Sequence, residues 1–279
     1  MKVTFLGTTS LLFDDGKDQI LFDCHVTRPT VFDFLLKKLS TDTEVSDRVI
    51  DQFKMDRLKA IFISHTHHDH VMDAPYFAKK CNAKIYGSKS ARNVALGGGI
   101  KEEDVFCYED SMKYEIGDYK ISIIPSIHSK AHWYNNDLGQ TIDKPLIQPV
   151  KKKEYKEGGS FDFLVENNNK KYLIRPSYNF IEGQLDGIEA DAMFLGIAGL
   201  SKDNENRKNT FYKETIDKVK PHTVIPVHWD NFLSPLYKKE KWRTGIVEDP
   251  NKAISIIENE CNKRRIEFIL QLPLSTIEL

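Results

Sequence analysis

The chain has 279 residues, of which 40% are hydrophobic and 29% charged, a composition that excludes a disordered or fibrous protein and favours a globular one. Its 40 Lys and Arg residues are balanced by 41 Asp and Glu residues, so the basic excess expected of a nucleic-acid-binding protein is missing. The 4 cysteines are scattered without a CxxC pair, which excludes a disulfide scaffold and is typical of reduced thiols in the cytoplasm.

Strands and helices alternate along the first half of the chain. In chain order, the pattern predicts strands over residues 3–6, 11–13 and 19–23, helices over 31–39 and 45–53, a strand over 58–64, a helix over 74–81, a strand over 84–86, a helix from 88 and a strand over 120–125. The start does not resemble a signal peptide, and no stretch approaches the roughly 20 apolar residues that span a bilayer. We therefore expect a cytoplasmic protein without membrane contact.

The second half repeats this order. Its pattern predicts strands over 161–166, 171–174 and 192–195, a helix over 210–218, a strand over 223–227, a helix over 250–262 and a strand over 266–270. No Pro-, Gly- or Ser-rich linker separates the halves, so we expect one α/β domain over residues 1–279 with helices flanking two stacked mixed sheets.

Residues 129–160 form the least regular connection. A connection of this length inside a compact domain is usually functional or disordered. Two interpretations remain open: a lid or insertion over a site, or a solvated excursion.

The strongest chemical signal is a histidine-rich turn directly after the predicted strand over 58–64. It reads His65-Thr66-His67-His68-Asp69-His70, so four of the nine histidines fall within six residues. Imidazole and carboxylate groups are ligands for Zn²⁺ and similar divalent ions. His65 and His67 lie two residues apart, so both rings can face one point. Asp69 and His70 begin the next turn and can face a second point, while His68 is expected to point away.

Two more histidines stand directly after predicted strands. His128 follows the strand over 120–125, and His228 follows the strand over 223–227. Strand ends of this kind deliver side chains to a common rim, so both are candidate ligands alongside the histidine-rich turn.

Together these features resemble the metallo-β-lactamase superfamily: a strand meander ending in Asp23, the HxHxDH turn, the strand-end His128, and the sequence Ile-Pro-Val-His that ends at His228. The resemblance implies a four-layer αββα sandwich with metals at one edge between the sheets. The late IPxH strand is similar to the ascorbate-phosphate-lactonase-like branch. The implied ligand sets are His65, His67 and His128 for a first metal, and Asp69, His70 and His228 for a second.

The chain departs from the family at the position of the usual bridging Asp, where it has Ser177. Either two ions bind, bridged by hydroxide, or one site is filled. Two ions with only Asp69 and one hydroxide leave a charge of about +2, which favours an anionic substrate. Arg175 and Lys130 are expected to add to that preference. Alternatively, Asp230 either supplies a carboxylate ligand or caps a turn.

The implied activity is metal-dependent hydrolysis, because a metal-bound hydroxide is available as a nucleophile near pH 7. The expected substrate is a small anionic ester, lactone or phosphodiester, and the expected cofactor is one or two divalent ions, Zn²⁺ first and Mn²⁺ or Fe²⁺ as alternatives. Asp69 is expected to orient the nucleophile, and Tyr178, His132 or Lys130 to stabilise the oxyanion. His25 and His132 are candidates for supporting or substrate contacts.

The sequence leaves two other functions as alternatives. A non-catalytic sensor that binds a metal or an anion is compatible with the missing Asp. A nuclease is disfavoured by the balanced charge, because nucleic-acid binding needs clustered Lys and Arg.

Overall fold

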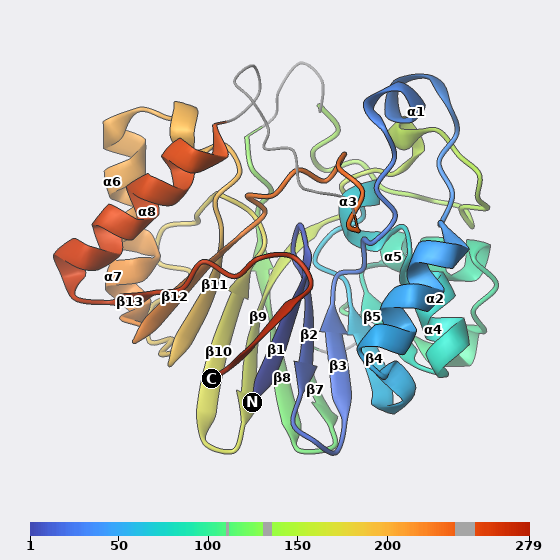
Figure 1. Ribbon diagram of the computed structural model, residues 1–279, viewed down its shortest axis with the longest axis horizontal. Helices are drawn as coiled ribbons and strands as arrows, with labels where there is room; N and C mark the ends of the chain where they lie inside the picture. The colour runs from blue at the N-terminus through green and yellow to red at the C-terminus, as the bar shows by residue number, and fades with distance from the viewer. Residues whose placement is uncertain (110–111, 131–135, 238–248) are drawn as a thin grey trace.

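The computed structural model describes residues 1–109, 112–130, 136–237 and 249–279 (Figure 1). Two seven-stranded sheets face each other, in the orders β14-β1-β2-β3-β4-β5-β6 and β13-β12-β11-β10-β9-β8-β7. The strands are β1 (Lys2–Gly7), β2 (Ser10–Asp14), β3 (Gln19–Phe22), β4 (Leu58–Phe62), β5 (Lys84–Gly87), β6 (Val105–Cys107), β7 (Lys113–Ile116), β8 (Tyr119–Ser126), β9 (Ser160–Asn167), β10 (Lys170–Arg175), β11 (Ala192–Gly196), β12 (Thr223–Val227), β13 (Glu267–Phe268) and β14 (Ser275–Glu278).

Helices cover the outer face of each sheet (Figure 1). The α-helices of the described residues are α1 (Val31–Leu36), α2 (Thr43–Gln52), α3 (His68–Val71), α4 (Ala74–Cys81), α5 (Lys89–Gly97), α6 (Glu205–Glu214), α7 (Ile216–Val219) and α8 (Pro250–Arg264). Helices α2, α4 and α5 lie on the side of the first sheet, and α6, α7 and α8 on the side of the second. The expected four-layer sandwich of two mixed sheets flanked by helices is therefore confirmed. None of the helices in the described ranges has the length and apolar character needed to cross a bilayer.

Apolar side chains of the first sheet point alternately to its two faces, so both faces are buried, one against the second sheet and one against helices. In β3, Ile20 and Phe22 point into the cluster between the sheets, whereas Leu21 joins the cluster under α4 and α5. Aromatic rings join the two sheets: Phe22 lies 5.0 Å from Phe163, measured between ring centroids, and other pairs repeat this contact along the sheets. The burial of these rings holds the sheets together.

The structure departs from the predicted elements at several points; for example, α1 ends at Leu36 rather than at residue 39, and the short helix α3 was not predicted. The helix predicted over 210–218 begins earlier, at Glu205, because the Asn204 side chain accepts a hydrogen bond from the Arg207 N–H at 2.9 Å, and it breaks at Thr215. The strands β6, β7 and β14 are absent from the predicted elements.

Residues 136–160 pack against the body of the protein. The side chains of Ile142, Val150 and Tyr155 are buried in the cluster under the first sheet. The Thr66 N–H also donates to the Glu157 carbonyl at 2.8 Å, which ties this segment to the histidine-rich turn. These contacts do not support a solvated excursion for the described part of the segment.

Four strand ends define the edge where the candidate ligands lie. Residue 23 follows β3, the histidine-rich turn follows β4, residue 128 follows β8 and residue 228 follows β12. Both sheets therefore contribute to one rim, near α3 in Figure 1.

Candidate metal centre

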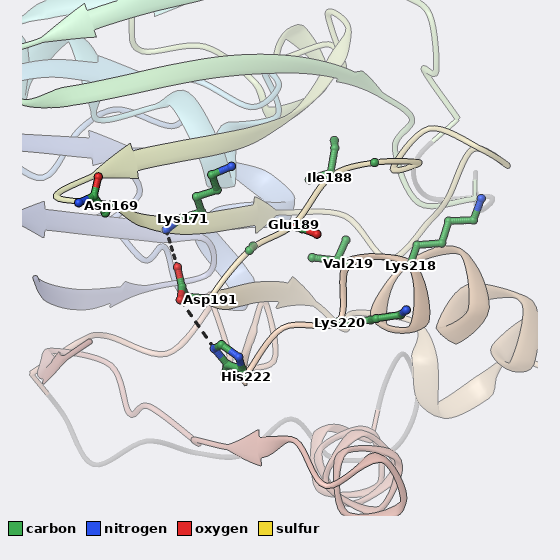
Figure 2. A pocket seen from close by; sticks show the side chains of 11 residues that line it. Asn169, Lys171, Ile188, Glu189, Asp191, Lys218, Val219, Lys220 and His222 are labelled. Carbon is green, nitrogen blue, oxygen red and sulfur yellow. Dashed lines mark hydrogen bonds and ion pairs between the residues drawn. The ribbon is translucent and has the colours of Figure 1, made fainter.

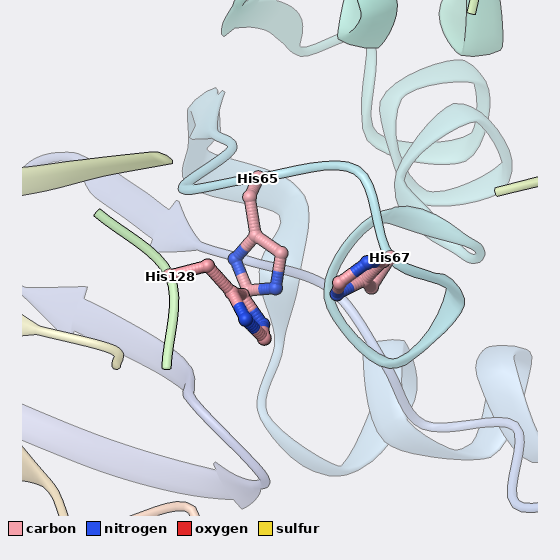
Figure 3. Close-up of side chains that lie close together, drawn as sticks. All are labelled: His65, His67 and His128. Atoms are coloured by element: carbon pink, nitrogen blue, oxygen red, sulfur yellow. The ribbon is translucent and has the colours of Figure 1, made fainter. Parts of the chain in front are cut away.

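Three histidines from two sheets converge at this edge. His65, His67 and His128 each offer a nitrogen, and the three atoms lie within 4.8 Å of one another. Figure 3 shows the rings turned toward one another, with ring centroids 4.7–4.9 Å apart. This spacing suits three imidazoles around one ion.

A second group adjoins the first. Asp69, His70 and His228 offer ligand atoms that also lie within 4.8 Å of one another. The His228 Nε2 is 3.6 Å from the Asp69 carboxylate, and the His70 ring is 3.7 Å from that of His65 between centroids. The two groups adjoin each other, so the structure brings together all six residues that the resemblance implied as candidate ligands.

The local backbone explains how neighbouring residues serve different groups. His67 is extended, with φ −63° and ψ 150°, and α3 begins at the next residue, so the chain changes direction between the two groups. His228 has φ +59°, and its N–H donates to the Thr8 carbonyl at 2.5 Å. The left-handed conformation is uncommon for a residue other than Gly, so this contact fixes an unusual turn after β12.

Asp23 orients the second group. This fully buried carboxylate accepts the Ser64 N–H on one oxygen at 2.7 Å, and on the other it accepts the hydroxyls of Thr9 and Ser64 and the His70 Nδ1 at 2.5–2.7 Å. A carboxylate can only accept, so the His70 proton lies on Nδ1. The lone pair on His70 Nε2 is then free for an ion.

The same rule determines the tautomer of His128 in the first group, because a carbonyl oxygen can only accept. His128 Nδ1 donates to the Ser129 carbonyl at 2.9 Å, and His65 Nδ1 contacts the Ser64 hydroxyl at 3.1 Å. His65 Nε2 is buried and has no hydrogen-bond partner among the described residues. A buried imidazole nitrogen without a partner is costly, so these donors fit a divalent ion.

Asp137, which lies within residues 129–160, completes the first group and was not predicted. Its carboxylate accepts from His67 Nε2 at 3.1 Å, which leaves His67 Nδ1 as the candidate ligand atom. Carboxylates that hold ligand histidines in this way are common around metal sites. Nothing in the local sequence marks Asp137, because its partner is 70 residues away.

Burial and nearby charge set the protonation of the site. Burial lowers the pKa of His65 well below its usual value and that of His128 to about 3, so both are neutral at pH 7. Burial also opposes the charged form of His70, but the carboxylates of Asp23 and Asp69 outweigh it and raise its pKa. Burial acts to raise the pKa of Asp69, but the neighbouring imidazoles hold it well below its usual range.

Two other predicted residues, Tyr178 and Arg175, have partners outside the two ligand groups. The Tyr178 hydroxyl donates to Asp203 at 3.1 Å and its ring packs on Phe211, so these contacts give no support for stabilisation of an oxyanion. Arg175 is buried and donates from Nε to Asp162 at 2.8 Å, which leaves its charge paired inside the protein rather than at a substrate.

Asp230 is not a ligand in this structure. Its carboxylate pairs with the buried Arg28 guanidinium at 2.5 Å and accepts the Thr8 N–H at 2.8 Å. Both partners of Asp230 come from the start of the chain, so its carboxylate joins distant segments rather than acting as a ligand or as a local cap. Because Thr8 also contacts His228, this ion pair supports the turn that carries a candidate ligand.

The other predicted site residues differ in how far their side chains are exposed to solvent. Lys130 is exposed, whereas His25 is fully buried and has no accessible surface for a substrate. Ser177 is 8% exposed, and the Asn179 N–H donates to its carbonyl at 3.0 Å. His132 lies outside the described residues.

A pocket of about 430 Å³ lies at the opposite ends of the strands, where β11 and β12 begin (Figure 2). Asp191 closes one side by accepting the Lys171 N–H at 2.8 Å and contacting His222 at 3.7 Å. His222 is highly exposed and belongs to neither ligand group.

Comparisons with known proteins agree with this site. The family model described as the metallo-beta-lactamase superfamily matches residues 3–108, which include the histidine-rich turn. The UPF0173 metal-dependent hydrolase of Nanoarchaeum equitans is 23% identical over 184 residues, which cover 65% of this chain and 74% of the relative. The resemblance to the metallo-β-lactamase superfamily inferred from the sequence is therefore confirmed.

Solved structures extend the likeness in fold to the whole chain. Igni18, a metallo hydrolase from Ignicoccus hospitalis, has a TM-score of 0.61 at 17% identity, covering 100% of this chain and 98% of its own. Zn²⁺-bound PqqB from Methylobacterium extorquens has a TM-score of 0.56 at 11% identity, covering 100% of both chains. At these identities the likeness establishes the fold alone.

Proposed function

Starting from the metallo-beta-lactamase fold and its double centre, we propose that the chain is a metal-dependent hydrolase. The observation that carries this proposal is the orientation of the imidazoles. Hydrogen bonds to Asp23 and Ser129 occupy Nδ1 of His70 and His128, and each leaves Nε2 toward its ligand group. Such preorganisation is expected where donors must hold a cation.

The expected ligands are His65, His67 and His128 for one ion and Asp69, His70 and His228 for the other. We propose Zn²⁺, because imidazole nitrogen and carboxylate oxygen suit it, with Mn²⁺ or Fe²⁺ as alternatives. A bound divalent ion lowers the pKa of water toward neutrality and polarises the bond under attack.

The chain's own residues position the reactants. Asp69 remains ionised and acceptor-only, so it can orient the attacking water by accepting its hydrogen bond. Asp137 holds His67, and Lys130 is exposed two residues beyond His128, where its ammonium can contact a polar substrate group.

The carboxylates around the site revise the inferred charge. The sequence-based count of about +2 included Asp69 and one hydroxide. Asp23 and Asp137, which bond directly to ligand histidines, add two negative charges and bring the count with two ions to about zero. A site charge near zero gives little preference for an anionic substrate. We therefore propose a small ester or lactone, as the lactonase-like resemblance suggests, with a phosphodiester as second choice.

A non-catalytic metal sensor is the second candidate function. It is favoured by Ser177, whose neutral hydroxyl bridges two ions less well than a carboxylate does. This alternative predicts metal binding without turnover.

Metal content and hydrolysis measured together test the proposal. Purified protein is analysed by mass spectrometry for bound metal, then assayed with lactones, p-nitrophenyl esters and p-nitrophenyl phosphodiesters before and after chelation. We expect chelator-sensitive turnover and its loss in His67→Ala, with His222→Ala as a matched control far from the site. Bound metal without turnover of any compound would favour the sensor, and unchanged metal content in His67→Ala would contradict the ligand assignment.

A further inference from the structure

An aromatic wall borders the second ligand group. We define it as Phe34, His68 and Phe232. The centroid of the Phe34 ring lies 5.1 Å from that of His68 and 6.4 Å from that of Phe232, and the last two rings are 6.0 Å apart. The three rings come from α1, α3 and the segment after β12, so this cluster exists only in the folded chain.

The wall is continuous with the metal centre. Phe232 lies 6.3 Å from the ring of the candidate ligand His228, and the His68 Nδ1 lies 3.6 Å from the carboxylate of the candidate ligand Asp69. A substrate whose reacting bond lies at the ligand groups therefore has this wall beside it.

Two polar groups belong to or adjoin the aromatic wall: the His68 imidazole and the Lys152 ammonium. His68 is 8% exposed, and its Nε2 is buried without a hydrogen-bond partner among the described residues. The Lys152 ammonium lies 4.2 Å from the centroid of the Phe34 ring. Phe34 and Phe232 are both partly exposed, so apolar surface remains accessible. Apolar side chains with a few polar groups are typical of sites for small molecules.

We propose that the aromatic wall is a subsite for an apolar alkyl or aryl group of the substrate. The substrate is then an ester or lactone that carries a hydrocarbon group against Phe34 and Phe232, with its reacting carbonyl at the ligand groups. This inference rests on the proposed function. With the site charge near zero, contact with this group supplies a larger part of the specificity.

Straight-chain carboxylates, which resemble the acid product of ester hydrolysis, probe this subsite. The affinities of acetate, butanoate, hexanoate and octanoate for the zinc-loaded protein are measured by calorimetry. We expect the dissociation constant to fall roughly fourfold per buried methylene, the factor that corresponds to about 0.8 kcal/mol. Phe34→Ala and Phe232→Ala should flatten this dependence while leaving acetate affinity unchanged, and Phe34→Leu should retain most of it.

Phe32→Ala is the matched control. Phe32 is 63% exposed on the same helix, and residues two apart on a helix do not face each other, so this variant should keep the full dependence. Equal affinities from acetate to octanoate in the wild type, or an equal loss in Phe32→Ala, would overturn the inference. If affinity rises with chain length but no ester is turned over, the subsite is supported and the proposed function is contradicted. If esters are turned over but affinity does not depend on chain length, the proposed function is supported and the subsite is contradicted.

Discussion

Replacing Asp23 by Asn tests whether the buried carboxylate controls the metal centre through the tautomer of His70. The change preserves shape but converts one oxygen to an NH₂ group. Because the Ser64 N–H can only donate, the remaining oxygen must stay on that side, at the present 2.7 Å. The new NH₂ group then faces His70 Nδ1, which must accept, and the ring proton moves to Nε2, the candidate ligand atom.

Two magnitudes follow from this exchange. Loss of a partner that holds a ligand histidine typically lowers metal affinity by about 10- to 100-fold. Loss of hydrogen bonds to a buried charged acceptor lowers the free energy of unfolding by about 1.5–3 kcal/mol for each bond that is not replaced. We expect Asp23→Asn to fold, to be less stable, and to bind its second zinc ion at least tenfold more weakly. A competition titration with a chromophoric chelator measures the affinity, and urea denaturation measures the stability.

Asp73→Asn is the control for stability alone. Asp73 is also fully buried, and it accepts the N–H groups of Val26 and Thr27 and the Thr27 hydroxyl at 2.7–2.8 Å, without a hydrogen bond to an imidazole among the described residues. It should lose stability and keep its zinc affinity. The reasoning is refuted if folded Asp23→Asn binds zinc like the wild type, or if Asp73→Asn loses the same affinity.

Three more perturbations test separate parts of the structure. Ser177→Asp should tighten the second zinc ion by roughly tenfold, because a carboxylate bridges better than a hydroxyl; an unchanged chelator titration would contradict the assigned position. Asp230→Ala leaves the buried Arg28 unpaired and should cost about 3–5 kcal/mol in urea denaturation, and an unchanged midpoint would argue against a supporting role. Burial lowers the pKa of His68 to about 4, so this imidazole takes up a proton at about pH 6 in the unfolded chain but not in the folded one. The free energy of unfolding of the metal-free protein should therefore fall by roughly 1.4 kcal/mol per such imidazole as the pH drops from 7.5 to 5.5. The raised pKa of His70 has the opposite effect, because the folded protein binds that proton more tightly than the unfolded chain does. Urea denaturation at both pH values measures the net change in the free energy of unfolding.

Local pattern was sufficient for much of the fold. The strand β4 and the helix α4 are visible in the sequence because an apolar run and a 3.6-residue period each report a local conformation. Strand ends also indicated where His128 and His228 would lie, since both follow strands that were predicted within one residue or two.

Side-chain partners were less predictable. Tyr178 and Arg175 carry chemistry that suits an active site, and their positions near Ser177 favoured such a role. Their partners, Asp203 and Asp162, come from other parts of the chain and hold both side chains inside the protein. A residue type indicates what a group can do, but not which way it points.

The sequence by itself determined that an imidazole-rich turn follows a buried strand, because ligand spacing and strand periodicity are both local properties. Only the tertiary structure decided that Asp137 holds His67, that Asp23 holds His70, and that the charge around the centre is lower than the ligand count implied. These pairs are separated by 70 and 47 residues in the chain, and no local pattern encodes contacts that form only when the sheets and the segment over 136–160 pack together.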